Sequence, residues 1–515
     1  MNLVRGGRRN MKLRSIINLA IILLLLSAGI QSIGAQAPFQ GFDDYVNKAM
    51  KDWEVPGMAI AIVKDDKVVF AKGFGLREMG KTTPVDEHTI FAIGSSSKAF
   101  TATSIAMLVD DKKLKWDDHA TQYLPGFQLF DPYATREMTV RDLLTHRIGL
   151  ERGDQLWYAT AYSRDDVLRR IRYLEPSSSM RSKFGYQNIM FLAAGQIIPS
   201  VTGKSWDDFL TERIFTPLGM KDTNTTIRTL SKSNDVSTPH QKVDGKLQPI
   251  AWRLIDNIGP AGSINSNVVD MAQWLRLQLG NGKYEGKQLV SAATLDETHT
   301  PQSIIRREGP YTIFYPDAHF MSYGMGWFLS DFRGKKLVEH GGAIDGMRAE
   351  VAMIPEANVG IVILTNVGGT LLPQFLAYRI FDSYMGQPAR DWQAEALPKM
   401  QALEKQGAAA QQKALAERVM GTKSSLDLKE YAGKYKSEMY GDAEIKFDDG
   451  KLTAEFGPYF NGDLEHWNYD TFQVKWRDRV EGNGFVQFNL NARGKVDSVD
   501  LGGMGKFKRM PDKVN

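Results

Sequence analysis

The sequence predicts an α+β protein: an antiparallel sheet flanked by helices, a helical insertion within the sheet domain, and a small C-terminal all-β barrel. Two β-rich runs surround a short "KDDK" turn in residues 58–75, and three more occur at 336–342, 348–355 and 359–366. Turn-rich and helix-rich sequence separates the two groups. We therefore expect strands from both ends of one domain to pair in a single sheet.

Changes in pattern along the 515 residues indicate the domain boundaries. We expect a signal peptide at 1–37, an α+β domain at 38–387 with its helical insertion at about 116–300, a helical linker at 388–423, and a barrel at 424–515. The linker is rich in Ala, Gln, Lys and Glu. The barrel is indicated by short alternating runs separated by Asp-Gly, Asn-Gly and Gly-Lys turns.

The N-terminus has the pattern of an export signal. Basic "MNLVRGGRRNMKLR" precedes apolar "LAIILLLL" and then small, polar "SAGIQSIGAQAP". The apolar run is shorter than the roughly 20 residues of a membrane span. We expect cleavage after Ala35 or Ala37 and a periplasmic or extracellular protein with no membrane span. An uncleaved signal anchor is the alternative.

Composition excludes several classes of function. The net charge is only +4, and no Lys/Arg run occurs beyond the N-terminus, so we expect no nucleic-acid partner. The chain has no cysteine, which excludes disulfides, a cysteine nucleophile and any cysteine-based metal site.

The stretch "FAIGSSSKAFTATSIAMLVDD", residues 91–111, carries the first chemical signal. Positions i and i+3 share a helix face, so Ser95 and Lys98 are expected side by side where an apolar helix begins. A serine becomes a nucleophile when a base takes its proton, and a lysine serves when burial lowers its pKa. In the alternative reading, Ser96 or Ser97 caps the helix and Lys98 is solvated.

Two further sequence stretches carry candidate site residues in addition to Ser95 and Lys98. "FGYQNIMFLAAGQII" places Tyr186, a potential proton relay, and Asn188, a potential positioning amide, before an apolar helix. "VEHGGAIDG" places His340, Gly341 and Gly342 at the end of a predicted strand, where glycines would let a substrate backbone approach. A hairpin turn with a surface histidine is the alternative for the second stretch.

Six landmarks occur in the order and rough spacing of the serine β-lactamase-related superfamily, which includes class C β-lactamases, D-peptidases, penicillin-binding proteins and esterases. They are "FAIGSSSKAFTA", "MTVRDLLTHRIGL", "FGYQN", "FTPLGM", "GPAGSINS" and "HGGAIDG", and the resemblance covers about residues 40–385. Y-x-N in place of S-D-N resembles the class C and esterase branch. The resemblance implies a β-lactamase/penicillin-binding-protein-like fold.

The resemblance also implies roles for individual residues. Ser95 would be the acylated nucleophile, with Lys98 and Tyr186 as its proton-shuttling pair. Asn188 would position substrate, and the backbone N–H groups of Ser95 and Ala343 would form the oxyanion hole. The expected substrate-binding set is thus Asn188, His340, Gly341, Gly342 and Ala343. The family's chemistry requires no metal and no organic cofactor.

Two departures from the family pattern stand out. Most β-lactamases carry lysine where this chain has His340, and a histidine is mostly neutral near pH 7. This favours a peptide, amide or ester substrate over a penicillin. In "HRIGL", Ile148 stands where serine is usual, and His146 matches a landmark for which we expect a packing role.

The C-terminal segment resembles a β-barrel module appended to some peptidases and esterases of this group. Its aromatic residues either line a cavity or, as we expect, form the barrel core; they are Tyr459, Phe460, Trp467 and Tyr469.

The sequence therefore predicts an exported serine hydrolase that takes a small-molecule or peptide substrate, with its oligomeric state left open. Peptide or amide hydrolysis leads, with a possible preference for D-residues; ester hydrolysis follows and β-lactam hydrolysis comes third. A catalytically silent protein that senses peptidoglycan fragments or β-lactams is the rival from another class.

Overall fold

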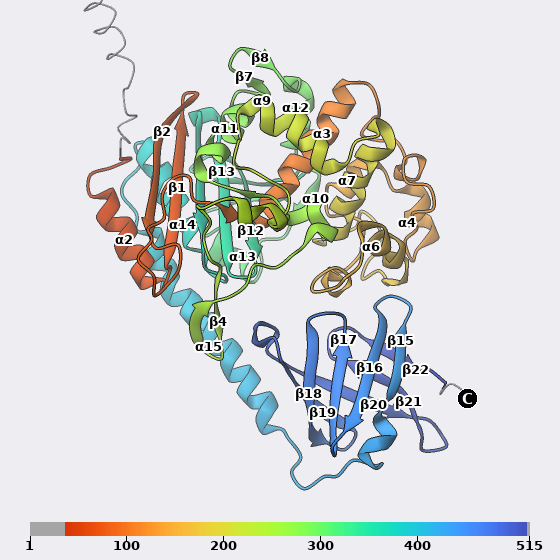
Figure 1. Cartoon of the computed structure of the whole chain (residues 1–515). Helices are drawn as coiled ribbons and strands as arrows, with labels where there is room; N and C mark the ends of the chain where they lie inside the picture. Colours follow the sequence, from red (N-terminus) through yellow and green to blue (C-terminus); the bar gives the residue numbers. More distant parts are fainter. Residues whose placement is uncertain (1–36, 512–515) are drawn as a thin grey trace, which may run out of the picture.

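A computed structural model describes residues 37–511, and Figure 1 shows a sheet domain, a long helix and a separate barrel. The predicted α+β fold class is confirmed. The predicted signal peptide and its cleavage sites lie almost wholly outside the described residues. Among the described residues, no helix is both long and apolar enough to cross a membrane.

The main sheet has eight antiparallel strands in the order β2-β1-β14-β13-β12-β11-β10-β9. The first strands of the domain pair with the last, because β1 lies beside β14 with Met58 opposite Thr365. The strands are β1 (Gly57–Lys64), β2 (Lys67–Gly75), β9 (Ser303–Ile305), β10 (Met321–Tyr323), β11 (Phe328–Phe332), β12 (Lys335–Ile344), β13 (Met347–Ile354) and β14 (Val359–Thr365).

Helices cover both faces of this sheet (Figure 1). One face packs against α2 (Phe42–Asp52), α14 (Leu372–Tyr384) and the start of α15 (Trp392–Ala416). The other packs against α3 (Ser97–Asp110), α7 (Asn188–Thr202) and α11 (Val268–Leu279). With both faces covered, β14 is buried at every residue, which explains its uninterrupted apolar sequence.

The segment between β2 and β9 contains short helices and three two-stranded ribbons. The helices are α4 (Pro132–Glu137), α5 (Val140–Leu143), α6 (Arg164–Arg170), α8 (Trp206–Leu210), α9 (Thr216–Leu218), α10 (Gly259–Gly262) and α12 (Ala292–Thr298); α13 (Tyr311–Phe314) follows β9. The ribbons are β3 (Phe91–Ala92) with β6 (Asn265–Ser266), β4 (His240–Val243) with β5 (Lys246–Pro249), and β7 (Lys283–Tyr284) with β8 (Lys287–Gln288).

Eight further strands close into the C-terminal barrel. They are β15 (Gly433–Ser437), β16 (Gly441–Asp448), β17 (Lys451–Phe456), β18 (Phe460–Asn468), β19 (Thr471–Trp476), β20 (Asn483–Leu490), β21 (Val496–Leu501) and β22 (Lys506–Arg509). The expectation of a core role is confirmed for two of the four barrel aromatics: Phe460 is buried in the core and the half-buried Tyr459 packs against it. It is wrong for Trp467, which is half-buried beneath Arg418 outside the core, and for Tyr469, which is exposed.

Strand β12 and the turn that carries Ser95 approach unusually closely. A Cβ on Gly342 would lie 1.8 Å from the carbonyl oxygen of Ile93, and one on Gly94 would lie 2.6 Å from the nitrogen of Ala343. Gly94 also has a φ of +50°, which favours glycine. Gly341 and Gly342 were expected to let a substrate backbone approach. In the structure, the missing side chain of Gly342 makes room for the protein's own backbone at Ile93.

Gly342→Ala is therefore expected to push β12 away from the Ser95 turn. Because small misplacements of reacting groups are costly, we expect kcat/KM to fall by about 100-fold or more, with a lowered Tm. Gly341→Ala is the matched control, since its Cβ would crowd only the side-chain ends of Arg348 and Glu350, while the nearest backbone atom, the Ala349 oxygen, lies at an ordinary 3.5 Å. Equal, small effects of the two substitutions would contradict this account of the packing.

Candidate active site

The three serines of "GSSSK" have three different environments. Ser95 lies in the 3-10 turn Gly94–Ser96 and faces the Lys98 amine. Ser96 donates from Oγ to the carbonyl oxygen of His340 at 2.8 Å, and the Ser97 Oγ accepts from the N–H of Ile264 at 3.2 Å. Ser96 occupies the N-cap position of α3 as the alternative reading suggested, but its side chain makes no capping hydrogen bond. Lys98 is fully buried, so the solvated lysine of that reading is wrong.

Lys98 is placed as a base for Ser95. Its Nζ lies 3.0 Å from the Ser95 Oγ and donates to the carbonyl oxygen of Ala261 at 2.8 Å. Burial holds the pKa of Lys98 well below its usual range, and the nearby Arg152 guanidinium lowers it further, against a smaller opposing effect of Asp154. A neutral amine beside a serine hydroxyl can accept its proton.

Tyr186 lies beside the same pair. The Lys98 Nζ is 5.0 Å from the centre of the Tyr186 ring, and the Arg152 guanidinium carbon is 5.1 Å from it. Burial raises the pKa of Tyr186, and a hydrogen bond with Ser95 and the charge of Arg152 only partly offset this. Tyr186 is therefore a neutral phenol that can donate a proton while Lys98 accepts one.

Asn188 begins helix α7 and lines the cavity. Its side-chain amide is bonded to an acidic residue of the protein. Its Nδ2 donates to Asp154 Oδ1 at 2.8 Å, and no hydrogen bond with Lys98 is present among residues 37–511. Asp154 also accepts from Arg152 Nε at 2.5 Å and from Trp157 Nε1 at 2.9 Å. Asp154 thus connects the amide to the arginine that acts on Lys98.

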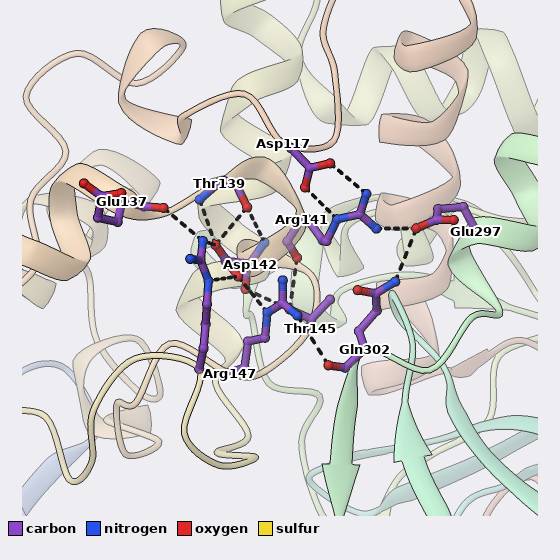
Figure 2. A network of polar contacts seen from close by, with 10 residues as sticks. Asp117, Glu137, Thr139, Arg141, Asp142, Thr145, Arg147, Glu297 and Gln302 are labelled. Carbon is purple, nitrogen blue, oxygen red and sulfur yellow. Dashed lines mark hydrogen bonds and ion pairs between the residues drawn. The ribbon is translucent and has the colours of Figure 1, made fainter.

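An ion-pair network around the buried Asp142 carboxylate supports the segment that precedes Arg152 and Asp154 (Figure 2). Asp142 is fully buried and accepts from the Thr139 hydroxyl, from Arg147 Nε at 2.7 Å and from Arg181 Nη2 at 2.5 Å. Breaking such a buried pair typically costs about 3–5 kcal/mol, because a charge is left uncompensated. The network holds residues 139–147 against the segment that precedes Tyr186.

His146 has the packing position that the sequence suggested. Its ring centre is 4.1 Å from that of Tyr186 and 4.5 Å from that of Tyr323. Its Nδ1 accepts from the N–H of Gln187 at 3.1 Å. The residue is buried at a φ of +54°, so tertiary contacts maintain an uncommon backbone conformation next to the Tyr186 ring.

The side chain of His340 lies behind the site rather than in it. It is buried, its Nε2 lies 3.0 Å from the Tyr323 hydroxyl, and it is not among the residues that line the cavity. Burial lowers the pKa of His340 to about 3, so the imidazole is neutral. The structure thus gives no support to substrate contact by the His340 side chain, and β12 continues beyond it to Ile344.

A cavity of about 620 Å³ opens at Ser95 and is lined there by Arg152, Asn188, Ala261 and Ala343. Strand β12 pairs with β11 only up to Glu339, so its edge from residue 340 to 344 has a strand on one side only. Ala343 is exposed on this edge, where its N–H could join that of Ser95 in binding an oxyanion.

The barrel meets the sheet domain close to this edge. Asp345, two residues past Ala343, accepts from Arg253 Nε at 2.8 Å and from the Tyr158 hydroxyl at 2.7 Å. Arg253 Nη2 in turn donates to Glu481 of the barrel at 2.7 Å. Burial raises the pKa of Glu481, and Arg253 opposes this shift. The turn after β12 is therefore tied to the barrel by a shared guanidinium.

The structure thus gathers Ser95, Lys98, Tyr186 and Asn188 at one end of a cavity, with the backbone of Ala343 beside them. Sequence reasoning missed Arg152 and Asp154, which come from an irregular loop with no motif. It noted "GPAGSINS" as a landmark but assigned no role to the Ala261 carbonyl, because backbone acceptors leave no trace in a sequence.

Comparison with known families finds a match for each of the two domains. A family model described as Beta-lactamase matches residues 42–383, and one described as Domain of unknown function (DUF3471) matches 417–510. The first match covers most of the chain. The protein therefore belongs to the beta-lactamase family of serine hydrolases.

Among its relatives, unguisins hydrolase ungD of Aspergillus violaceofuscus is 28% identical, over 81% of this chain and 78% of that protein. Protein flp of Staphylococcus aureus is 26% identical, over 66% of this chain and 65% of that protein. The octameric penicillin-binding protein homologue from Pyrococcus abyssi has a TM-score of 0.60 at 23% identity, covering 90% of this chain and 98% of that one. This last likeness concerns the fold.

The influence of Arg152 on Lys98 leads to a pH prediction. Lys98 can act as a base only in its neutral form, which predominates above its lowered pKa. Activity should therefore rise as the pH increases past this pKa. Arg152→Gln removes a charge that lowers this pKa, so the acid limb of the kcat/KM profile should move to higher pH. Arg152→Lys keeps the charge and serves as control. Equal shifts in both variants, or none in either, would contradict the electrostatic role.

Proposed function

We propose that this protein is an exported serine hydrolase that forms an acyl-enzyme on Ser95 and cleaves peptide, amide or ester bonds. The observation that carries the proposal is the buried Lys98 amine, 3.0 Å from the Ser95 Oγ at the inner end of a cavity. Perturbed titratable groups of this kind concentrate at functional sites. Export to the periplasm or the medium is supported by the N-terminal sequence pattern.

Acylation would proceed by proton transfer from Ser95 to Lys98 as Oγ attacks the substrate carbonyl carbon. The oxyanion so formed would accept from the N–H groups of Ser95 and Ala343. The neutral Tyr186 phenol would protonate the leaving amine or alkoxide and regain its proton from Lys98. The bond to the leaving group breaks, and the acyl group remains on Ser95 Oγ.

Deacylation would reverse these roles. A water molecule gives a proton to the Lys98–Tyr186 pair as its oxygen attacks the ester carbon, and Ser95 Oγ leaves and is reprotonated. The net reaction consumes one water and releases an acid and an amine or alcohol. Ser95, Lys98 and Tyr186 are the only side chains that exchange protons in this scheme.

The position of His340 supports a peptide, amide or ester over a β-lactam. Most β-lactamases carry at this place a lysine, whose charge helps to hold the substrate carboxylate. Here the side chain is neutral and turned away from the cavity. The Aspergillus relative is named a hydrolase of unguisins, which supports hydrolysis as the class of reaction.

The proposal predicts that a fluorophosphonate forms one adduct on the purified protein, located by mass spectrometry in residues 91–111. Ser95→Ala should abolish labelling, because no other serine among the described residues faces a buried amine in this way. Ser179→Ala, at an exposed position that does not line the cavity, should label like the wild type.

Unlabelled protein that hydrolyses nitrocefin faster than peptides or esters would favour the β-lactamase reading. Full labelling of Ser95→Ala would overturn the assigned nucleophile. A penicilloyl adduct on Ser95 that forms and is not hydrolysed, with no hydrolysis of peptides or esters, would favour a penicillin-recognising sensor.

A further inference from the structure

The cavity at Ser95 continues well beyond the groups used in the proposed reaction. Near Ser95 it is lined by Ile255, Ile258 and Ala261, which belong to the core between the sheet and α3, α7 and α11. At its other end it is lined by Trp53 and Met400, which pack on the core across the sheet. The cavity therefore runs past the ends of the strands from one side of the sheet to the other.

Helix α15, which the sequence suggested only as a linker, forms the far wall. Leu397, Met400, Gln401 and Glu404 line the cavity, and their spacing of i, i+3, i+4 and i+7 places them on one helix face. The first turns are fixed in place, since Trp392, Gln393 and Ala396 are buried. Leu397 and Met400, both half-buried, directly follow this anchored part, whereas Gln401 and Glu404 lie in the exposed remainder of the helix.

The wall opposite α15 is also apolar and anchored. Trp53 and Leu247 are half-buried there, next to the buried Val367. The Trp53 indole donates from Nε1 to Gln393 Oε1 at 3.0 Å, so the two walls are joined by a hydrogen bond. At the rim, Lys242 and Glu54 form an ion pair at 2.8 Å.

Residues 344–346, residues 368–370 and Gln241 also line the cavity. The edge of β12 at residues 340–344, which lacks a β11 partner, reaches this lining. Peptide groups of an extended chain could pair with this free edge, which a simple hydrocarbon could not do. This favours a peptide-like substrate over a lipid ester.

We propose that the 397–404 face of α15, with Trp53 and Leu247, is a remote subsite for an apolar side chain of an extended peptide substrate. The inference rests on the proposed function, because it assumes that Ser95 reacts with what the cavity holds. It makes α15 a determinant of specificity, and it explains why a helix leading to a separate barrel is anchored beside the active site.

The test compares Leu397→Ser with Leu403→Ser in the full-length protein. Leu403 lies on the same helix but is exposed and does not line the cavity. Ser95 labelling rates are measured with alkyl fluorophosphonates of increasing chain length. In parallel, calorimetry measures the binding of peptide amides to Ser95→Ala protein, which cannot cleave them by the proposed route. The peptides carry leucine or alanine at successive positions on each side of the central amide. Both the D and the L series are compared.

The wild type should label faster with longer chains and, in the Ser95→Ala background, bind leucine peptides more tightly at one position. Leu397→Ser should cut each preference by about tenfold, in line with lost contacts in an apolar pocket, and Leu403→Ser should not. Equal behaviour of the two variants, or no leucine preference, would overturn the subsite. A chain-length effect without a peptide effect would overturn the peptide assignment. Leucine-dependent binding with no labelling of Ser95 would keep the subsite and remove the proposed mechanism.

Discussion

Burial of the Lys98 amine is the constraint on which the rest of the site depends. A charged ammonium is costly to bury without a carboxylate, so the amine is neutral and can serve as a base. The helix that carries Lys98 is buried from Ser97 to Leu108, which accounts for its apolar sequence on every side. The amine retains two hydrogen-bonding neighbours, the Ser95 hydroxyl and the Ala261 carbonyl. Burial thus makes an ordinary lysine reactive and at the same time fixes its direction.

The fold brings these groups together from distant parts of the chain. Strand β12 approaches the Ser95 turn because glycines stand on both sides of the contact, and β1 from the start of the domain pairs with β14 from its end. The insertion supplies Tyr186, Asn188 and the Ala261 carbonyl. The barrel reaches the same region through Arg253 and Asp345, and α15 contributes a wall of the cavity. The sheet domain, the insertion and α15 therefore all line the cavity at one serine, and the barrel is bonded to a residue beside it.

Elements of the fold and site that depend on local sequence pattern could be predicted, whereas those that depend on tertiary contacts could not. The hairpin of β1 and β2, the strands β12 to β14 and the pair Ser95 and Lys98 have periodicities or spacings that a sequence displays directly. Strands β9 to β11 have only three to five residues each, too few for a period to be evident. The orientation of His340 depends on which face of β12 its side chain occupies. The effect of Arg152 depends on a loop, and no spacing indicates a charge that acts through space.

The most direct test of the central claim is the protonation state of Lys98, measured by NMR in protein labelled with 13C at lysine Cε and assigned with a Lys98→Arg variant. The account predicts that Lys98 is neutral at pH 7 and titrates far below the exposed lysines, whose usual pKa is about 10.4. A Lys98 signal that titrates together with the exposed lysines would show a charged amine at neutral pH, and Lys98 could then not be the base for Ser95.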